Sequence, residues 1–167
     1  APWINVLANP HFGTLVSESG GAYTWCENAQ LFRLTPWNND PVGDLAGETC
    51  YVRDDDSHEL WSPLPLPCGG DGYRMRHGHG YSQCEHVASG IHSEVTLFVD
   101  VEAPVRYLRL RLANHSGRVR NLAACACVEW TLADTRTRSL PHVVTDCDAR
   151  SGVLLARNAF NAEFQER

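Results

Sequence analysis

The run Trp37-Asn38-Asn39-Asp40 gathers the side-chain types that proteins use to hold sugars. An indole offers a flat apolar plate to the C–H face of a sugar ring, while amide and carboxylate groups hydrogen-bond the hydroxyls. The run lies within residues 26–47, a long segment without strand alternation that also contains Arg33. Aromatic and basic side chains are unusual in disordered tracts, so we expect an ordered functional loop.

Four other aromatic residues bear on this interpretation. Trp25, Trp61 and Tyr81 could extend the sugar-facing surface. However, Trp25, Trp61 and Trp130 fall inside apolar runs typical of strands, so we expect these three to be core residues.

No constellation for bond-breaking chemistry stands out. Hydrolysis of a glycosidic bond needs two carboxylates at a set separation, and nothing in the chain pairs any two of its acidic residues. The G-x-S-x-G, P-loop and dinucleotide-binding patterns do not occur. An aldose epimerase would need a His and a Glu as acid and base, and His77 and Glu85 would be the nominal pair.

One cluster has the residue types of a zinc site. His77, His79, Cys84 and His86 lie within a short span and could supply four ligands. Their spacing matches no common zinc motif, and the glycines between them suit a bend. We therefore favour sheet histidines and a buried thiol over a metal site.

Charge and cysteine content exclude other classes. Fourteen basic against twenty acidic residues give a net charge of −6, which argues against a nucleic-acid-binding protein. Seven cysteines, an odd number without framework spacing, argue against a disulfide scaffold. We expect reduced, mostly buried thiols and a cytoplasmic location.

The pattern of short alternating runs predicts an all-β protein, an antiparallel β-sandwich with little helix. Val95, Leu97, Val99 and Val101 should share one strand face. Residues 49–53 and 59–61 should form a hairpin, as should residues 105–113 and 120–132. The arginines of the second hairpin should form a solvated outer face; they are Arg106, Arg109, Arg111, Arg118 and Arg120. The one weak helical pattern covers residues 155–164.

Several segments, in order along the chain, resemble a known family. They are residues 9–17, 20–25, 33–41, 60–63, 76–81, 85–86 and 128–130. The most specific read Arg-Leu-Thr-Pro-Trp-Asn-Asn-Asp-Pro at residues 33–41 and Arg-His-Gly-His-Gly-Tyr at residues 76–81. They are similar to the phosphorylase region of cyclic β-1,2-glucan synthases, within the family of cellobiose and chitobiose phosphorylases.

The resemblance implies a β-supersandwich of the galactose-mutarotase type, placed before a helical barrel that holds the catalytic Asp and the phosphate site. Residues 1–167 would then be one sandwich domain, cut before its end, of a larger enzyme, with no catalytic residue and no cofactor of its own. Inorganic phosphate would be a co-substrate of that enzyme. Substrate-binding positions carried over are Arg33, Trp37, Asn38, Asn39, Asp40, Arg76, His77 and Tyr81. At His79 and Cys84 the chain departs from the family pattern, which weakens the metal hypothesis further.

Three functions follow as hypotheses. The first is a carbohydrate-binding scaffold of a glycosyl-transferring phosphorylase that acts on β-linked glucan. Its expected partners are a helical barrel of the parent chain and a second copy in a homodimer. Its expected location is the cytoplasm, with the parent enzyme free or anchored in the inner membrane. The second is a stand-alone carbohydrate-binding module, and the third is an aldose-epimerase-like enzyme.

Overall fold

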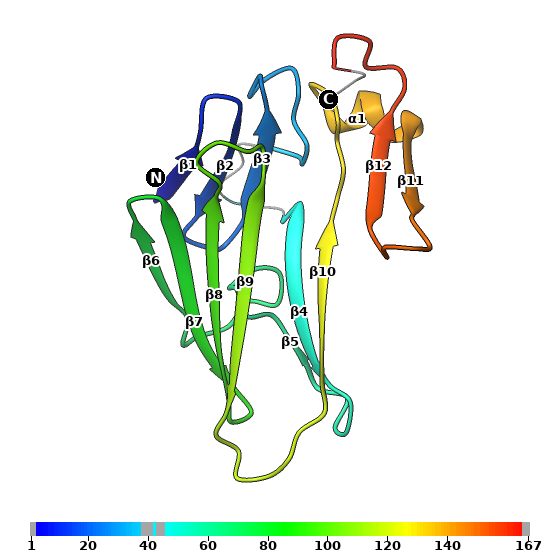
Figure 1. Ribbon diagram of the computed structural model, residues 1–167. Helices are drawn as coiled ribbons and strands as arrows, with labels where there is room; N and C mark the ends of the chain where they lie inside the picture. The colour runs from blue at the N-terminus through cyan, green and yellow to red at the C-terminus, as the bar shows by residue number, and fades with distance from the viewer. Residues whose placement is uncertain (1–2, 38–41, 43–45, 165–167) are drawn as a thin grey trace.

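The computed structural model describes residues 3–37, 42 and 46–164, and antiparallel strands dominate it (Figure 1). The strands are β1 (Ile4–Ala8), β2 (Phe12–Ser17), β3 (Ala22–Cys26), β4 (Glu48–Asp54), β5 (Leu60–Trp61), β6 (Arg74–Gly78), β7 (Tyr81–Ala88), β8 (Ile91–Val99), β9 (Arg106–Asn114), β10 (Leu122–Val128), β11 (Val143–Cys147) and β12 (Leu154–Asn158). A short helix, α1 (Arg136–Ser139), and a 3-10 turn, η1 (Leu140–His142), precede β11. The predicted all-β class is confirmed. No helix in the described ranges is long and apolar enough to cross a membrane.

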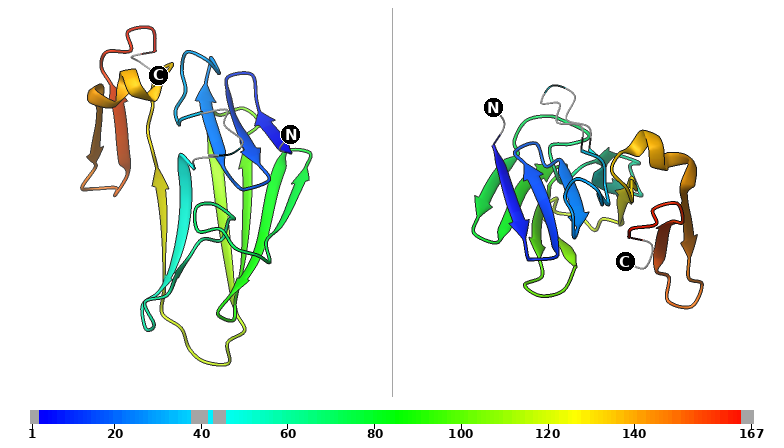
Figure 2. Two further views of the ribbon diagram at one scale, coloured as in Figure 1. Left: turned by 180° about the vertical axis from the view of Figure 1, so that it is seen from behind. Right: turned by 90° about the horizontal axis from the view of Figure 1, so that it is seen from above.

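Two layers of sheet enclose the core. One layer is the sheet β6-β7-β8-β9, and the other consists of β1-β2-β3 and β10-β4-β5. The strands β1 to β3 lie behind the four-stranded sheet in Figure 1 and in front of it when the molecule is seen from behind (Figure 2). Two clusters of buried side chains join the layers: Leu7, Val16 and Leu64 with Cys84, Val95 and Leu97, and Val52 and Trp61 with Ile91.

Strand β8 shows how alternation produces this core. Its odd-numbered residues from Ile91 to Leu97 are buried, and the even-numbered ones are half-buried on the outer face. The predicted inward face of Val95 and Leu97 is therefore confirmed. The strand ends at Val99, so Val101, which is 84% exposed, does not belong to that face.

Residues 33–35 connect the two sheets of the second layer. On one side the amide of Leu34 donates to the carbonyl of Thr24 in β3 (2.8 Å). On the other side Arg33 pairs with Ala133, and the amide of Thr131 donates to the carbonyl of Leu34 (2.8 Å). Two segments that lie far apart in the sequence are therefore neighbours in one layer.

A buried carboxylate ties this connection to the opposite layer. Glu48, at the start of β4, is only 7% exposed. The hydroxyls of Thr24 (2.6 Å) and Thr35 (2.8 Å) donate to its Oε1, and Arg106 of β9 forms an ion pair with its Oε2. Burial lowers the pKa of Arg106 to about 10, so the guanidinium stays protonated at neutral pH.

A second buried carboxylate, Asp54, organises the opposite end of β4. The amides of Asp56 and Ser57 donate to its Oδ1, and Arg120 Nε donates to its Oδ2 (2.7 Å). Desolvation opposes ionisation, but these hydrogen bonds outweigh it and lower the pKa of Asp54 to about 2. Arg120 thereby fixes the start of β10 beside β4.

The contact of Arg120 with Asp54 explains why one predicted hairpin is wrong. Residues 105–113 and 120–132 do not pair with each other: β9 pairs with β8, while β10 pairs with β4 in the other layer. The amide of Asp55 donates to the carbonyl of Asn121 (2.8 Å), and Asn121 Nδ2 donates to Asp56 (3.0 Å). The residues after β9 are therefore used to cross between the layers rather than to turn back.

Three smaller expectations are also wrong. Arg106 and Arg120 are buried in ion pairs instead of lying on a solvated face. The weak helical pattern at residues 155–164 is β12 followed by turns, because it pairs with β11. The thiols are free but not mostly buried: Cys68, Cys125, Cys127 and Cys147 are exposed.

Gly13 allows a close approach between β2 and β3. It lies opposite Trp25, and a β-carbon at this position would stand 2.3 Å from Cζ2 of the indole. No side chain fits there without moving the ring.

The Asp54→Asn substitution keeps an acceptor for the loop amides but removes the charge that faces Arg120. We expect Tm at pH 7 to fall by at least about 5 °C, because a buried guanidinium loses its counter-charge. The lowered pKa of Asp54 means that its stabilisation is present above about pH 4 and is lost as the pH falls towards about 2. Thermal unfolding followed by circular dichroism should show that the difference in Tm between wild type and variant becomes smaller as the pH falls through that range.

The matched control is Asp55→Asn, which removes an exposed carboxylate paired with Arg53. Its Tm should stay within about 1 °C of wild type. A Tm difference between wild type and Asp54→Asn that is equally large at pH 2 and pH 7 would contradict the role assigned to Asp54.

Gly13→Ala should cost about 1–3 kcal/mol of unfolding free energy, because the indole of Trp25 must move. The same change made in a Trp25→Leu background should cost less, since the ring is gone. Urea titration of the wild type, the two single variants and the double variant gives the coupling free energy between the two positions. An equal loss of unfolding free energy in both backgrounds would show that the contact with Trp25 is not the reason for glycine at position 13.

Candidate functional site

The segment after β3 turns back so that Arg33 lies between Trp25 of β3 and Ala133, and Trp37 follows it. Asn28 shapes this turn: its Oδ1 accepts the amides of Gln30 and Leu31 (both 2.9 Å), and its carbonyl accepts the amide of Phe32 (2.9 Å). Arg33 then pairs with Trp25 on one side and Ala133 on the other. The predicted ordered loop is thus confirmed for residues 26–37.

Three aromatic rings form a ladder beside this turn. Tyr23 lies between Trp25 and Trp37, with ring centroids 5.3 and 5.4 Å apart and both pairs tilted by 33°. The guanidinium carbon of Arg33 lies 5.9 Å from the centroid of the Tyr23 ring. Burial raises the pKa of Tyr23, and the positive charge of Arg33 opposes that rise. The phenol therefore stays neutral and serves as a packing and hydrogen-bonding group.

A pocket of about 320 Å³ opens next to Trp37. Its lining comes from two separate segments, with Arg33 and Trp37 from the first and Thr131 and Arg136 from the second. Arg136 forms an ion pair with Glu129, so part of its charge is already balanced. The pocket combines an aromatic side chain with guanidinium and hydroxyl groups.

Two residues that line this pocket each hold a buried polar atom without a hydrogen-bond partner. Arg33 Nε and Thr131 Oγ1 are buried and make no hydrogen bond within the described part of the chain. Thr131 as a whole is 0% exposed. Buried polar groups are usually satisfied, so these two unpaired atoms of pocket-lining residues are exceptions that call for a partner, such as an ordered water.

The remaining predicted site residues are distributed differently. Asn38, Asn39 and Asp40 lie outside the described residues. Arg76, His77 and Tyr81 lie on the β6–β7 hairpin, which Asn5 of β1 holds through hydrogen bonds to the carbonyls of Gly78 (3.0 Å) and Tyr81 (2.9 Å). This hairpin contacts β1, whereas Arg33 bridges to β3 on the opposite side of the sheet β1-β2-β3, so the two groups lie apart.

His77 and Glu85 face opposite sides of their sheet. His77 pairs with the buried Ser82 and shares a hydrogen bond with its hydroxyl (2.9 Å), whereas Glu85 forms an ion pair with Arg76 on the outer face (2.5 Å). Burial lowers the pKa of His77, and the hydrogen bond from Arg76 lowers the pKa of Glu85. The two cannot act as acid and base on one sugar ring, so the nominal epimerase pair is excluded by geometry.

The residues of the metal hypothesis also separate. Cys84 is packed in the core, where burial raises its pKa to about 11, and His86 stacks on Tyr73 at 3.8 Å. Within the described ranges, no three His, Cys, Asp or Glu side chains lie together in a way that could hold a metal ion.

Among the tryptophans, Trp61 is a core residue as predicted, at 5% exposure. Trp25 and Trp130 are half-buried, and Trp25 belongs to the aromatic ladder. The sequence did not single out Tyr23, Thr131 or Arg136. The pairing of Arg33 with Ala133 and the hydrogen bond from the amide of Thr131 to Leu34 bring Thr131 and Arg136 to the site, and no local pattern predicts these contacts.

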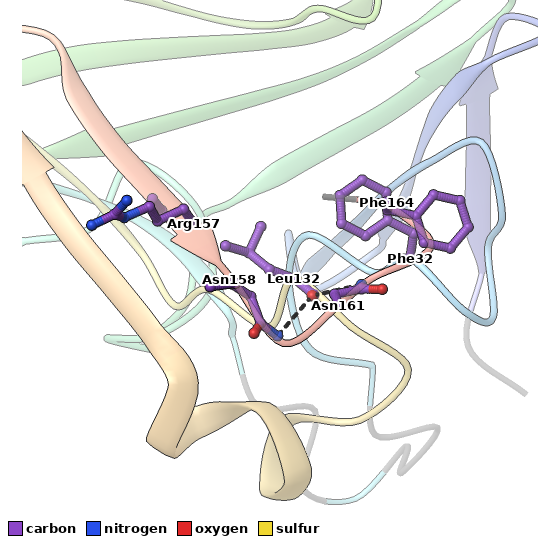
Figure 3. Close-up of a pocket in the computed structure, with 8 residues that line it drawn as sticks. Phe32, Leu132, Arg157, Asn158, Asn161 and Phe164 are labelled. Carbon is purple, nitrogen blue, oxygen red and sulfur yellow. Dashed lines mark hydrogen bonds between the residues drawn. The ribbon is translucent and has the colours of Figure 1, made fainter. Parts of the chain in front are cut away.

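A second pocket, of about 300 Å³, lies where the β11–β12 hairpin meets the sandwich (Figure 3). Its amides are already used: Asn158 and Asn161 both donate to the carbonyl of Leu132, at 3.2 and 3.0 Å. Phe32 and Phe164 stack at 4.7 Å on one side, and Arg157 extends away from them (Figure 3). These contacts attach the hairpin to the sandwich and leave few groups for a ligand.

Comparison with known proteins places this geometry in context. The chain is 33% identical to the cyclic beta-(1,2)-glucan synthase NdvB of Rhizobium meliloti, over 99% of the chain and 6% of that protein. It is 30% identical to an N,N'-diacetylchitobiose phosphorylase of Vibrio proteolyticus, over 85% of the chain and 18% of that protein. It is 31% identical to a solabiose phosphorylase of Paenibacillus borealis, over 94% of the chain and 21% of that protein. The chain thus spans about a fifth or less of each of these relatives.

The family model described as "Glycosyl hydrolase 94, supersandwich domain" matches residues 1–167. The match covers every strand, the aromatic ladder and the pocket beside Trp37. The resemblance inferred from the motifs is thereby confirmed, and the chain belongs to the glycosyl hydrolase 94 family, as its supersandwich domain.

Proposed function

We propose that this chain is the non-catalytic, sugar-facing scaffold of a glycoside phosphorylase-type enzyme that transfers glycosyl groups on β-linked glucan. The observation that supports this most is the pocket whose lining joins Trp37 to Arg33 and Thr131, two residues whose buried Nε and Oγ1 lack a hydrogen-bond partner. An aromatic side chain next to unsatisfied polar groups suits a sugar ring and its hydroxyls. Relatives named as a glucan synthase and as phosphorylases of saccharides agree with that ligand class.

The scaffold role is favoured over catalysis by this chain alone. His77 and Glu85 lie on opposite faces of the sheet, and Glu85 is neutralised by Arg76. The other buried carboxylates, Glu48 and Asp54, are each held by an arginine in the interior. A carboxylate fixed in this way cannot approach a substrate, because leaving its partner would expose a buried unpaired charge.

The proposal assigns bond breaking to a further part of the parent enzyme. There a helical barrel would supply the general acid and bind inorganic phosphate as co-substrate, and the sandwich would shape the sugar side of the pocket. Association of two copies of the parent and a cytoplasmic location of this domain belong to the same proposal.

The test is Trp37→Ala in the enzyme that includes this chain. We expect kcat/KM for the glucan substrate to fall by about tenfold, mainly through a higher KM, because stacking on the ring binds ground state and transition state alike. Steady-state kinetics with glucan and phosphate varied in turn would measure this.

The matched control is Trp3→Ala, which removes an indole that is 76% exposed and precedes β1 at the far edge of the sheet. Its kinetics should equal those of wild type. Equal kinetics for Trp37→Ala would refute the assigned site. Turnover of saccharides by the purified chain without the rest of the enzyme would refute the scaffold role. Tight glucan binding by the chain alone that is lost in Trp37→Ala would favour a stand-alone binding module.

A further inference from the structure

The outer face of the sheet β6–β9 is organised in rows that cross the strands. In an antiparallel sheet, residues directly opposite each other point to the same face. On this face, one row is aromatic apart from its first member: it consists of Gly78, Tyr81, Phe98 and Tyr107. Gly78 pairs with Tyr81, and Phe98 pairs with Tyr107. Ser82 pairs with Leu97, and one step further along these strands Tyr81 lies beside Phe98.

The aromatic row is accessible although it is apolar. Phe98 and Tyr107 stack with centroids 4.9 Å apart and an interplanar angle of 18°. The Tyr81 ring lies over Gly78, where a β-carbon would stand 2.3 Å from its Cε1. Tyr81 and Tyr107 are each 42% exposed. At about 4.8 Å per strand, the row extends about 14 Å across the sheet.

The next row on the same face is polar. It runs Arg76, Gln83, Thr96 and Arg109, one residue from each strand. Arg109 Nη2 donates to the hydroxyl of Thr96 at 3.3 Å, and its side chain is 66% exposed. Residues two apart on a strand are about 7 Å apart, so guanidinium, amide and hydroxyl groups run parallel to the rings at that distance.

The third row places carboxylates among the arginines. It consists of Arg74, Glu85, Glu94 and Arg111. Glu85 pairs with Arg76 at 2.5 Å, and Glu94 lies 3.5 Å from Arg109. Two carboxylates in the centre of the face oppose a polyanion such as nucleic acid, while planar groups that both donate and accept suit a neutral polyhydroxylated chain.

From this arrangement we infer that the outer face of β6–β9 is a second carbohydrate-binding surface, which takes a neutral β-linked gluco-oligosaccharide along its aromatic row. Sugar C–H faces stack on Tyr81 and on the Phe98–Tyr107 pair, and hydroxyls meet Gln83 and Arg109. The choice of a β-glucan rests on the proposed function. The surface itself is distinct from the pocket beside Trp37, which belongs to the opposite layer.

The test is titration of the protein with a linear β-1,2-linked gluco-oligosaccharide, followed by NMR chemical shifts of the backbone amides. Resonances of β7, β8 and β9 around the aromatic row should move. Tyr107→Ser and Tyr81→Ser should each weaken binding by about 3- to 10-fold, because each removes one exposed ring. The matched control Val87→Ser removes a 61% exposed apolar side chain from the same face of β7, six residues from Tyr81, and should bind as wild type does.

The outcomes separate this inference from the proposed function. Trp37→Ala should leave oligosaccharide binding at the sheet face unchanged. If Trp37→Ala abolishes binding while both tyrosine variants retain it, the sugar sits only in the pocket and the inference is overturned with the proposed function intact. Equal weakening by Val87→Ser, or binding of dextran sulfate in place of the neutral glucan, also overturns it. Binding that depends on the tyrosines, combined with normal kinetics of Trp37→Ala, would support the surface and refute the pocket.

Discussion

The carboxylate of Glu48 is the group on which most of the architecture depends. A charge at 7% exposure is tolerated only when hydrogen bonds and an opposite charge surround it, and here the partners come from β3, from residue 35 and from β9. Those partners belong to both layers of the sandwich. Because Thr35 must remain against Glu48, the preceding Arg33 and the following Trp37 are held at the edge where they meet residues 131–136. The interior ion pair and the surface pocket are therefore parts of one arrangement.

Local patterns predicted the strands better than their partners. The alternation in β8 and the hairpin of β4 and β5 follow from which residues are apolar, and the structure confirms both. The same kind of pattern in β10 shows only that a strand exists. Its partner is chosen by the contact of Arg120 with Asp54, which joins residues 66 positions apart. In the same way, Arg33 and Trp37 could be named from sequence, but Thr131 and Arg136 reach the pocket through long-range contacts.

Successive residues of a strand point to opposite faces of the sheet, and this alternation decides which side chains can meet one ligand even where their distance in sequence does not. His77 and Glu85 are near in sequence and on paired strands, yet His77 lies on the sheet face towards the other layer and Glu85 lies on the outer face. The same alternation places Tyr81, Phe98 and Tyr107 together on the outer face although they come from three strands. His77 and Glu85 therefore cannot act together on one ligand, whereas Tyr81, Phe98 and Tyr107 can contact the same ligand.

The two regions proposed to bind sugar differ in how many parts of the fold must be in place to form them. The pocket beside Trp37 is lined by two segments, one that contains Arg33 and Trp37 and one that contains Thr131 and Arg136. Its geometry therefore depends on the hydrogen bonds and ion pair around Glu48 and on the pairing that holds residues 131–136 in place. The aromatic row needs only the continuous sheet from β6 to β9, whose register is set by hydrogen bonds along adjacent strands. Loosening of the layer contact would consequently disturb the pocket first and leave the sheet face intact. Under the proposed function, this division would let the outer sheet face retain the glucan while the pocket adjusts to the reacting end.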